Sequence, residues 1–465
     1  MITYIKIDGF KSFRNFEMEF TPLTVVAGAN ASGKSNLFDA LKLISRLAET
    51  DNLKKAFNEQ RGEFIELFTQ YDDQHYAKQI KFEVEMLVSN KVKDGWGNKA
   101  QLKYTRLRYE LLIRRFTNDI GLEDIAVVEE QLFNLKHQED QWIKLIPRKN
   151  LENWRPKVTS GRRDRPYIFT ELINDIPTVI VPQDGVQGGN KRTFPLINAS
   201  RTVLSSFDTV DFPHILAAKE EMRSWKFLQL NPEDLRQPSS KQISEDKITA
   251  SGKNLAAALY RIKQLDAYTL TEISRKLNSF LPDFTQVDVF DEKENKQYVI
   301  KLRDKEKKEF SSRVLSEGTL RLLALCILEF DDAHKGLLCF EEPENGIHPF
   351  RLKSMVELLK DLSADFDDPA FSLRQVIINT HSPSLVALLR KFDSNINVSV
   401  FFSSMRSFMT NVEDKRYKIN ISKILPVDKN DQLQIDYSDQ DKNMTLAEVK
   451  KYLQSPDAEK NYSKV

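Results

Sequence analysis

The sequence predicts an α/β fold in which apolar strands end in polar loops that lead into helices. Three segments favour it: LTVVA at residues 23–27, LLCF at 337–340 and QVIIN at 375–379. Each run precedes small or ionisable residues and then a helix-like pattern. Ligands of such sheets collect beyond the carboxyl ends of the strands, so the three strand ends are expected to share one site.

Composition and charge limit the classes of protein. The 465 residues include 69 lysines and arginines against 68 acidic residues, a net charge of +1, so any surface for nucleic acid must be local. The two cysteines, Cys326 and Cys339, lie in apolar runs, as expected in a reducing compartment. No stretch approaches the roughly 20 apolar residues of a membrane span. The start, MITYIKIDGF, lacks the layout of a secretory signal. We expect a cytoplasmic protein that does not enter a membrane.

The first strand leads into the pattern G-x-x-x-x-G-K-[ST], formed by Gly28, Gly33, Lys34 and Ser35. The glycines let backbone N–H groups face phosphates, and the following helix adds its dipole. Lys34 is expected to reach the β- and γ-phosphates, and the Ser35 hydroxyl to hold Mg²⁺. The other loop residues expected to contact the nucleotide are Ala29, Asn30, Ala31, Ser32 and Asn36. The apolar strand before the loop and the helical face after it favour this phosphate loop (P-loop) over an ordinary strand–loop–helix.

Two carboxylates follow the second strand. Glu341 and Glu342 stand where one carboxylate can hold Mg²⁺ and another can orient the attacking water. We assign Glu341 to the metal and Glu342 to the general base. Taken alone, charges at a strand end are usually just solvated.

Two further segments belong with these. Ser316, Glu317 and Gly318 open an apolar helix 25 residues before Glu341 (341 − 316), where a serine N-cap is the simpler interpretation. His381 follows the third strand, and a histidine there becomes a candidate only because the other two strand ends are already occupied by candidate residues.

Together these segments resemble the ABC-type ATPase heads of the RecF, SMC and OLD-like group, and more narrowly the stand-alone prokaryotic AAA15/AAA21 ATPases. The shared stretches are IKIDGFKSFRNFEMEF, GANASGKSN, SGKNLAAAL, LSEGTLRLLAL, EEPENGIHP and THSP. The resemblance covers about the first 50 residues and roughly 250–390, and covers the middle poorly. It implies a P-loop ATPase that binds ATP and Mg²⁺.

The resemblance also implies a composite site. In such heads the signature caps the ATP held by a second copy, so Ser316, Glu317 and Gly318 would meet the nucleotide across a homodimer interface. His381 would be a switch histidine on the γ-phosphate, and Gln70 is the candidate for the family's Mg²⁺-contacting glutamine. Assembly beyond a dimer is left open.

Three positions depart from the family pattern. Ala31 replaces a common glycine, which is tolerable if its φ stays negative. Glu317 replaces the first glycine of the transporter-type signature and is expected to point away from the anion. Glu341 replaces the commoner aspartate, which favours a water-mediated contact with the metal.

We expect three regions. Residues 1–116 form the first part of the ATPase head, with the P-loop and an antiparallel β lobe predicted by the alternation in 79–115. Residues 117–284 form an inserted lid and helical subdomain, helix-like at 215–235 and 254–281. Residues 285–465 form the second part of the head, with the signature, the acidic strand end, the switch histidine and a C-terminal tail.

The tail is expected to hold two strands and a terminal helix capped by Thr445. Asp439 and Asp441 have the Asp-x-Asp spacing of the Toprim nuclease domain that OLD nucleases carry. No apolar strand precedes them, so we interpret them as a hydrophilic loop and expect no nuclease in this chain.

A basic segment lies at 144–165, with eight lysines and arginines against Glu152 and Asp164 and with Trp142 and Trp154 nearby. It matches a phosphate-backbone surface with stacking aromatics, while a solvated loop that balances acidic neighbours is the simpler alternative.

An ATPase head that has neither an effector domain nor coiled-coil arms is expected to act on another protein through its ATP-dependent change of state. The leading hypothesis is an ATPase whose ATP-dependent head dimerisation gates a separate nuclease or toxin in a prokaryotic antiphage-defence system, as in the Septu or PARIS systems. The alternative is a RecF-like DNA-binding ATPase of repair or recombination, which would use the segment 144–165.

Overall fold

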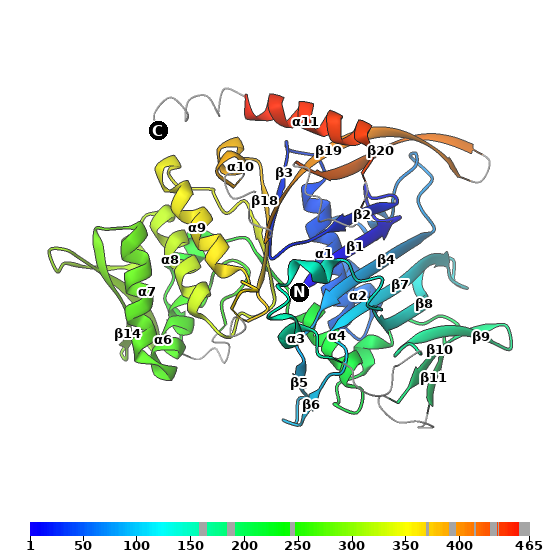
Figure 1. Ribbon diagram of the computed structural model, residues 1–465, viewed down its shortest axis with the longest axis horizontal. Helices are drawn as coiled ribbons and strands as arrows, with labels where there is room; N and C mark the ends of the chain where they lie inside the picture. The colour runs from blue at the N-terminus through cyan, green and yellow to red at the C-terminus, as the bar shows by residue number, and fades with distance from the viewer. Residues whose placement is uncertain are drawn as a thin grey trace.

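A six-stranded sheet runs through the centre of the molecule and separates two hydrophobic cores (Figure 1). The computed structural model describes residues 1–157, 165–183, 191–241, 247–368, 372–389, 397–412, 415–427, 435 and 437–454. In the central sheet the strand order is β12-β17-β18-β3-β19-β20, with all neighbours parallel except β19 and β20. These strands are β3 (Leu23–Ala27), β12 (Lys226–Leu228), β17 (Leu337–Glu341), β18 (Gln375–Thr380), β19 (Val398–Val412) and β20 (Lys415–Pro426).

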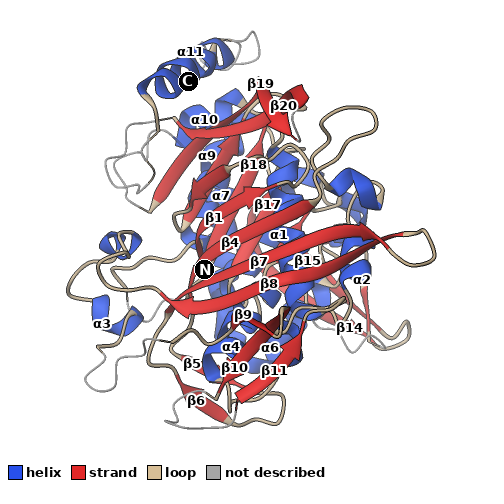
Figure 2. Cartoon of the chain, turned by 90° about the vertical axis from the view of Figure 1, so that its right-hand side faces the viewer, coloured by secondary structure: helices blue, strands red, loops and turns tan. Residues whose placement is uncertain are grey.

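An antiparallel sheet packs beside it in the order β2-β1-β4-β7-β8 (Figure 2). Its strands are β1 (Ile2–Asp8), β2 (Phe16–Glu19), β4 (Gln79–Leu87), β7 (Arg106–Thr117) and β8 (Glu123–Asn134). This is the antiparallel β lobe that alternation in 79–115 predicted, and that prediction is confirmed.

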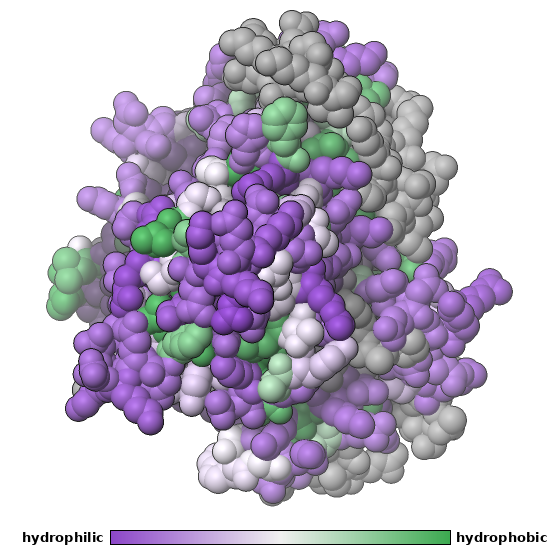
Figure 3. All heavy atoms as spheres, turned by 90° about the vertical axis from the view of Figure 1, so that its left-hand side faces the viewer, coloured by the Kyte–Doolittle hydropathy of each residue, from purple (hydrophilic) through white to green (hydrophobic). Residues whose placement is uncertain are grey.

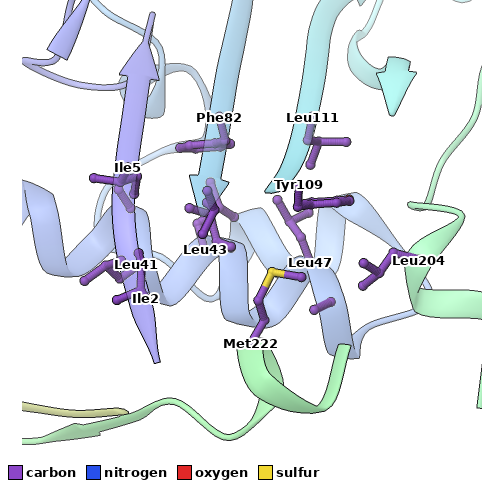
Figure 4. Close-up of a cluster of buried hydrophobic side chains, with 14 of the residues drawn as sticks. Ile2, Ile5, Leu41, Leu43, Leu47, Phe82, Tyr109, Leu111, Leu204 and Met222 are labelled. Carbon is purple, nitrogen blue, oxygen red and sulfur yellow. The ribbon is translucent and has the colours of Figure 1, made fainter. Parts of the chain in front are cut away.

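Helix α1 (Lys34–Glu49) fills the space between the two sheets. The predicted helical face is buried, and it consists of Leu37, Ala40, Leu41 and Ile44. Its side chains share the first core with strands β1, β4 and β7, and with Met222 of helix α4 (Pro213–Arg223) (Figure 4). The helix that follows the P-loop is therefore held on both sides by apolar contacts.

The other face of the central sheet carries the second core. Alternation along each strand divides the side chains, because successive residues point to opposite faces: Leu338 and Phe340 join the second core, while Cys339 joins the first. The helices of this lobe are α5 (Pro232–Arg236), α6 (Leu255–Leu265), α7 (Ala267–Phe280), α8 (Glu317–Phe330), α9 (Leu352–Leu362) and α10 (Pro383–Leu389). They lie with the sheet β13-β15-β14, to which β16 is added. Its strands are β13 (Ser239–Ser240), β14 (Phe284–Glu292), β15 (Gln297–Asp304) and β16 (Glu309–Ser311).

The described side chains on the outer face of this lobe are mainly hydrophilic, with small hydrophobic areas (Figure 3). Helix α8 lies deeper, and its buried residues go all the way round, including Leu322, Leu325 and Cys326 as well as the predicted apolar face. A helix that is apolar on every side is buried on every side.

The remaining elements, apart from α11, are short. They are helices α2 (Leu53–Asn58), α3 (Leu151–Trp154) and α11 (Asp439–Leu453), strands β5 (Lys91–Lys93), β6 (Lys99–Gln101), β9 (Phe169–Ile173), β10 (Ile176–Pro182) and β11 (Lys191–Pro195), and single 3₁₀ turns at Phe64–Leu67, Trp142–Leu145, Leu204–Ser206, Ser312–Val314 and Pro349–Arg351.

The range 117–284, expected as an inserted lid and helical subdomain, is divided between the two cores. β8 completes the antiparallel sheet, α4 packs on α1, and β12 is the edge strand of the central sheet. Helices α6 and α7, at the predicted 254–281, belong to the second core, together with Leu235 of α5 and Leu228 of β12. The stretch 215–235 is helix, strand and helix, because its middle residues 226–228 pair in parallel with β17. A strand of three residues is too short to show the alternation that would reveal it in the sequence.

The tail also differs from the expectation. Ser438, and not Thr445, caps α11, since the Ser438 side chain accepts a hydrogen bond from Asp441 N. Thr445 lies inside the helix and donates to the carbonyl of Asp441. Asp439 and Asp441 are in the first turn of this helix and not in a loop, and Asp441 pairs with Arg406 of β19. The two predicted strands of the tail are β19 and β20.

A buried ion pair joins β7 to the segment that follows β8. Arg106 is 1% exposed and its Nη2 lies 3.0 Å from Oδ1 of Asp140, which is fully buried. Asp140 also accepts a hydrogen bond from Nη1 of Arg155 at 2.7 Å, and Arg106 donates to Thr3 Oγ1 at 2.8 Å. One aspartate therefore neutralises two cations inside the first lobe.

Replacing Asp140 by alanine is expected to lower the free energy of unfolding by about 3–5 kcal/mol, because it removes the carboxylate that Arg106 and Arg155 share and leaves Arg106 only Glu85, at 3.6 Å. Chemical denaturation followed by circular dichroism measures the change. Glu139→Ala, one residue away and exposed, is the matched control and should shift stability by no more than about 0.5 kcal/mol. Equal denaturation midpoints for the two variants would contradict the structural role of this pair.

Candidate functional site

The ends of three parallel strands coincide, as the strand ends in the sequence predicted. Asn379 of β18 lies opposite Glu341 of β17 on one side and opposite Val26 of β3 on the other. Thr380 then pairs with Ala27, the last residue before the P-loop. The P-loop, the acidic strand end and the segment before His381 therefore start from one edge of one sheet.

Glycine is required at both ends of the P-loop. Gly28 has φ 150°, and Gly33, the N-cap of α1, has φ 95°. A Cβ on Gly33 would lie 1.7 Å from Ser422 Oγ, and a Cβ on Gly28 would lie 2.5 Å from the carbonyl oxygen of Ser403. The loop is thus pressed against β19 and β20 at the two positions where the motif demands glycine.

Ala31 has φ 61°, so the condition under which alanine would be tolerated here, a negative φ, is not met. A left-handed backbone costs a residue other than glycine about 1–3 kcal/mol, and such strain collects at functional sites. Ala31 is exposed at the outside of the loop, where the turn of the backbone and not a side-chain contact sets its conformation.

Lys34 is folded back into its own loop. Its Nζ donates to the carbonyl oxygens of Gly28 and Ala29, each at 2.8 Å, and the residue is 6% exposed. Burial lowers the pKa of Lys34, while the charges of Glu342 and Glu344 oppose that shift. A desolvated ammonium held by two carbonyls is a group that a phosphate oxygen can draw away, since a charge-assisted bond is stronger than a bond to a neutral acceptor.

Unlike Lys34, one polar side chain of the loop lacks a hydrogen bond within the described structure. Ser32 Oγ is buried and has no hydrogen-bond partner among the described residues. Buried polar groups in native proteins are nearly always paired, so an orphan hydroxyl in a phosphate loop is an observation that fits a missing ligand. Ser35, the expected Mg²⁺ ligand, is half-buried in the first turn of α1.

The structure brings Glu342 and His381 together. Glu342 Oε1 lies 3.1 Å from His381 Nδ1, and Oε2 accepts a hydrogen bond from Asn345 Nδ2 at 2.8 Å. The backbone of Glu342 is left-handed, with φ 46°, and its N–H donates to both the carbonyl and the side-chain oxygen of Asn379 at 3.1 Å. The neighbouring strand thus fixes the residue expected to act as general base.

Glu341 belongs to a charge network that the sequence did not reveal. Arg61 Nη2 lies 3.7 Å from Glu341 Oε1 and 2.9 Å from Asp39 Oδ1, and Lys11 Nζ lies 2.7 Å from Asp39 Oδ2. Burial raises the pKa of Glu341, and Arg61 opposes that rise. A usable signal was present: Asp39 is a charged residue within the buried stripe of the helix after the P-loop.

Glu344 is a third carboxylate of the site, and it too was missed. It is 8% exposed, accepts a hydrogen bond from Thr380 Oγ1, and burial raises its pKa. Its Oε2 has no partner among the described residues. The third glutamate of EEPE was the only sign of it in the sequence.

The signature turn is built as a helix start. Ser316 caps α8, and its Oγ accepts from Thr319 N at 3.3 Å. Glu317 pairs with Arg321 one turn along the same helix at 2.9 Å, in keeping with a side chain directed away from an anion. Gly318 packs against the turn after Glu342, since a Cβ there would lie 3.0 Å from the carbonyl oxygen of Gly346.

The structure does not bring the signature to the P-loop of its own chain. Among the described residues, no hydrogen bond or ion pair joins 315–318 to 28–36. Ser316–Gly318 open a helix of the second core, whereas α1 belongs to the first.

Two other expected contacts are placed differently. Gln70 is exposed and forms an isolated bridge with Tyr76, and no hydrogen bond described for it reaches Ser35 or Glu341. Asn36 donates to Ser12 Oγ at 2.7 Å, and Ser12 meets Ser422 Oγ at 2.6 Å. Asn36 thus ties the P-loop to β1–β2 and β20, a role that only the folded chain shows.

The aromatic part of the basic segment 144–165 is not a stacking surface. Trp142 and Trp154 are 2% and 9% exposed and pack edge-on against Phe366. Arg155 serves the buried Asp140, and Lys149 pairs with Asp367. Arg162 and Arg163 lie outside the described residues.

The described residues suit a nucleotide with Mg²⁺ better than a metal alone. No group of three or more His, Cys, Asp and Glu within the described ranges forms a metal site by itself. Mg²⁺ is usually held by one or two carboxylates together with substrate phosphates, and Ser35 and Glu341 are the residues that would hold it here. ATP would supply the remaining oxygens. In the part of the chain that is described, no helix has the length and apolar character to span a membrane.

Comparison with known proteins gives the following likenesses. No curated protein matches the chain. The chain is similar to the SmcHead solved with the C-winged helix domain of ScpA, at 16% identity over 90% of this chain and 98% of that one, with a TM-score of 0.45. It is also similar to the SMC head domain from Thermotoga maritima, at 12% identity over 92% of this chain and 99% of that one, with a TM-score of 0.38. A third likeness is to the Smc head with an extended coiled coil, bound to the C-terminal domain of ScpA derived from Pyrococcus furiosus. Its identity is 13% over 90% of this chain and 96% of that one, with a TM-score of 0.41.

Family membership comes from a family model that matches residues 23–387, which contain every motif of the site. The P-loop after β3, the acidic end of β17 and the histidine after β18 stand in the order and at the sheet edge described above. The chain is an ABC-type P-loop ATPase head and belongs to the family of AAA domains described as "putative AbiEii toxin, Type IV TA system".

Proposed function

We propose that this protein binds and hydrolyses ATP with Mg²⁺, that ATP closes two copies into a homodimer, and that the closed and open states gate a separate effector protein. The observation that carries the proposal is the contact between Glu342 and His381 beside the buried Lys34. It combines a base, a γ-phosphate sensor and a phosphate-binding cation at one sheet edge.

The chemistry follows from the chain's own groups. Lys34 would neutralise part of the phosphate charge, the amides of the P-loop would donate hydrogen bonds to the phosphates, and Ser35 with Glu341 would hold Mg²⁺, which would supply further positive charge. Glu342 accepts a proton from the attacking water. His381 bonds the γ-phosphate, and its contact with Glu342 links the presence of that phosphate to the position of the base.

Dimerisation is supported by the place of the signature. Among the described residues, Ser316 and Gly318 make no hydrogen bond or ion pair with the P-loop of their own chain, and a helix N-terminus can bind an anion. Two large apolar side chains near this turn face solvent: Val314 is 69% exposed and Phe350 is 70% exposed. A second copy would cover them and would place its nucleotide against Ser316.

In this proposal, the closed and open states of the dimer act differently on the effector. ATP can shift the equilibrium only by its different affinity for the closed and open states, and hydrolysis removes the γ-phosphate contacts that favour closure. The family description, "putative AbiEii toxin, Type IV TA system", gives the toxin role to the family itself. The proposal of a separate nuclease or toxin as the effector in prokaryotic defence therefore rests on the resemblance to antiphage ATPases.

Replacing Lys34 by alanine is expected to weaken ATP binding at least about tenfold, since a hydrogen bond to a charged group contributes about 1.5–3 kcal/mol. Isothermal titration calorimetry with a non-hydrolysable ATP analogue measures the loss. Lys55→Ala, an exposed lysine of α2, is the control. An unchanged affinity in the Lys34 variant would refute the P-loop assignment.

A mixture of Lys34→Ala and Ser316→Arg chains tests the composite site. Each variant alone should be nearly inactive, whereas the mixed dimer keeps one interface in which both halves are intact. Phosphate release should recover towards a quarter of the wild-type rate when the two chains are mixed equally, because half of the dimers are mixed and each holds one good site. No recovery would show that each site is built within one chain.

The effector is tested by affinity capture from the native host. The bait is Glu342→Gln, which should bind ATP, hydrolyse it slowly and elute as a dimer on size exclusion in ATP. Lys34→Ala is the matched open-state bait. The proposal expects a protein whose recovery differs at least severalfold between the two baits. Equal recovery of every captured protein, or capture of nucleic acid alone, would contradict gating of an effector protein.

A further inference from the structure

A cavity of about 580 Å³ lies between α1, β12 and residues 247–250. Its walls carry five basic side chains and, within the described residues, no carboxylate. The basic residues are Lys42, Arg46, Arg223, Lys226 and Lys247. Trp225, Phe227 and Leu228 supply apolar surface beside them.

Two of the five basic side chains form ion pairs with nearby carboxylates. Arg46 pairs with Glu49 at 2.5 Å and with Glu59 at 2.6 Å, and Arg223 pairs with Glu220 at 2.9 Å. The two arginines are therefore neutralised by acidic groups outside the cavity.

The three lysines of the cavity lack such ion pairs within the described part of the chain. Among the described residues, Lys226 and Lys247 have no ion pair, and Lys42 Nζ donates only to the carbonyl of Glu59, at 3.4 Å. Burial lowers the pKa of Lys226, and Lys247, Arg46 and Arg223 lower it further, against the opposing charge of Glu49. Like charges held together in a concave site repel one another, and a bound polyanion would relieve that repulsion.

The lysines are held by backbone fixed to the core. Lys226 pairs with Leu338 of β17. Next to Lys247, the N–H of Ile248 donates to Nε2 of the buried His334 at 3.3 Å, and Gln229 N donates to the carbonyl of Ala250 at 2.9 Å. Folding thus holds these cations close to one another despite their mutual repulsion.

We propose that this cavity binds a small ligand with a chain of phosphate groups, such as a nucleoside polyphosphate or inorganic polyphosphate, at a site separate from the P-loop. The volume lies in the range of small-molecule pockets, and several cations on different elements match several phosphates. Lys42 is eight residues beyond Lys34 on α1, which is about 12 Å along the helix.

Two elements that form this cavity, α1 and β12, are also connected to the proposed ATPase site. Helix α1 begins at Lys34, and Leu228 of β12 lies opposite Phe340, the residue before Glu341. A ligand here contacts the same helix and the same sheet edge that carry the P-loop and the metal-binding strand end.

The test uses full-length Lys34→Ala protein, in which the P-loop is disabled, and calorimetry with inorganic tripolyphosphate at constant ionic strength without Mg²⁺. Tripolyphosphate should bind, and adding Lys226→Ala and Lys247→Ala should weaken it at least tenfold. The control adds Lys305→Ala and Lys308→Ala, two exposed lysines near β16, and should leave the affinity unchanged. The single change Lys247→Glu, at an exposed position, should weaken binding in the same direction if the double variant folds poorly.

Three results would overturn the proposal: no binding of tripolyphosphate, equal affinity in the cavity and control variants, or tighter binding of a 12-nucleotide single strand that depends on the same lysines. The last result would make this face a nucleic-acid surface. Lys34→Ala is the background throughout, so failure of the ATPase proposal leaves this test unaffected.

Discussion

The level at which β3, β17 and β18 end is the constraint on which the site depends. Parallel register places Asn379 between Val26 and Glu341, and the next residues of all three chain segments leave the sheet at one edge. Asn379 then binds the N–H of Glu342 through two oxygens and holds that residue in a left-handed conformation. A slip of one residue in any pairing would turn the side chains to the opposite face and separate the base from the P-loop.

Burial at this edge disfavours the charged forms of both the basic and the acidic side chains of the site. The pKa of Lys34 is lowered, whereas the pKa values of Glu341 and Glu344 are raised, and in each case burial is the main cause. Each group alone is destabilised in its charged form. In the proposed ATPase, phosphate oxygens would compensate the charge of Lys34 and Mg²⁺ would compensate the carboxylates, so that one pair of ligands would stabilise both kinds of group.

Helix α1 links the parts of the molecule. It is buried between the two sheets, carries Lys34 at its start and Asp39 in its middle, and ends beside the basic cavity. The P-loop in turn is pressed against the C-terminal hairpin, where Ser403 donates to the carbonyl of Ser32. Residues nearly 400 positions apart therefore shape the same phosphate site. A ligand that moves this helix would affect both the nucleotide and the hairpin.

The sequence by itself determined the local elements: the strand–loop–helix around Lys34, the acidic end of β17, the N-cap at Ser316 and the antiparallel alternation in 79–115. These follow from short-range periodicity and from the conformational freedom of glycine. Only the tertiary structure decided that β12 is an edge strand, that Trp142 and Trp154 are buried, and that Asp39, Arg61 and Glu344 join the site. Those outcomes depend on long-range packing and on charge pairs between distant segments, which leave no regular spacing along the chain.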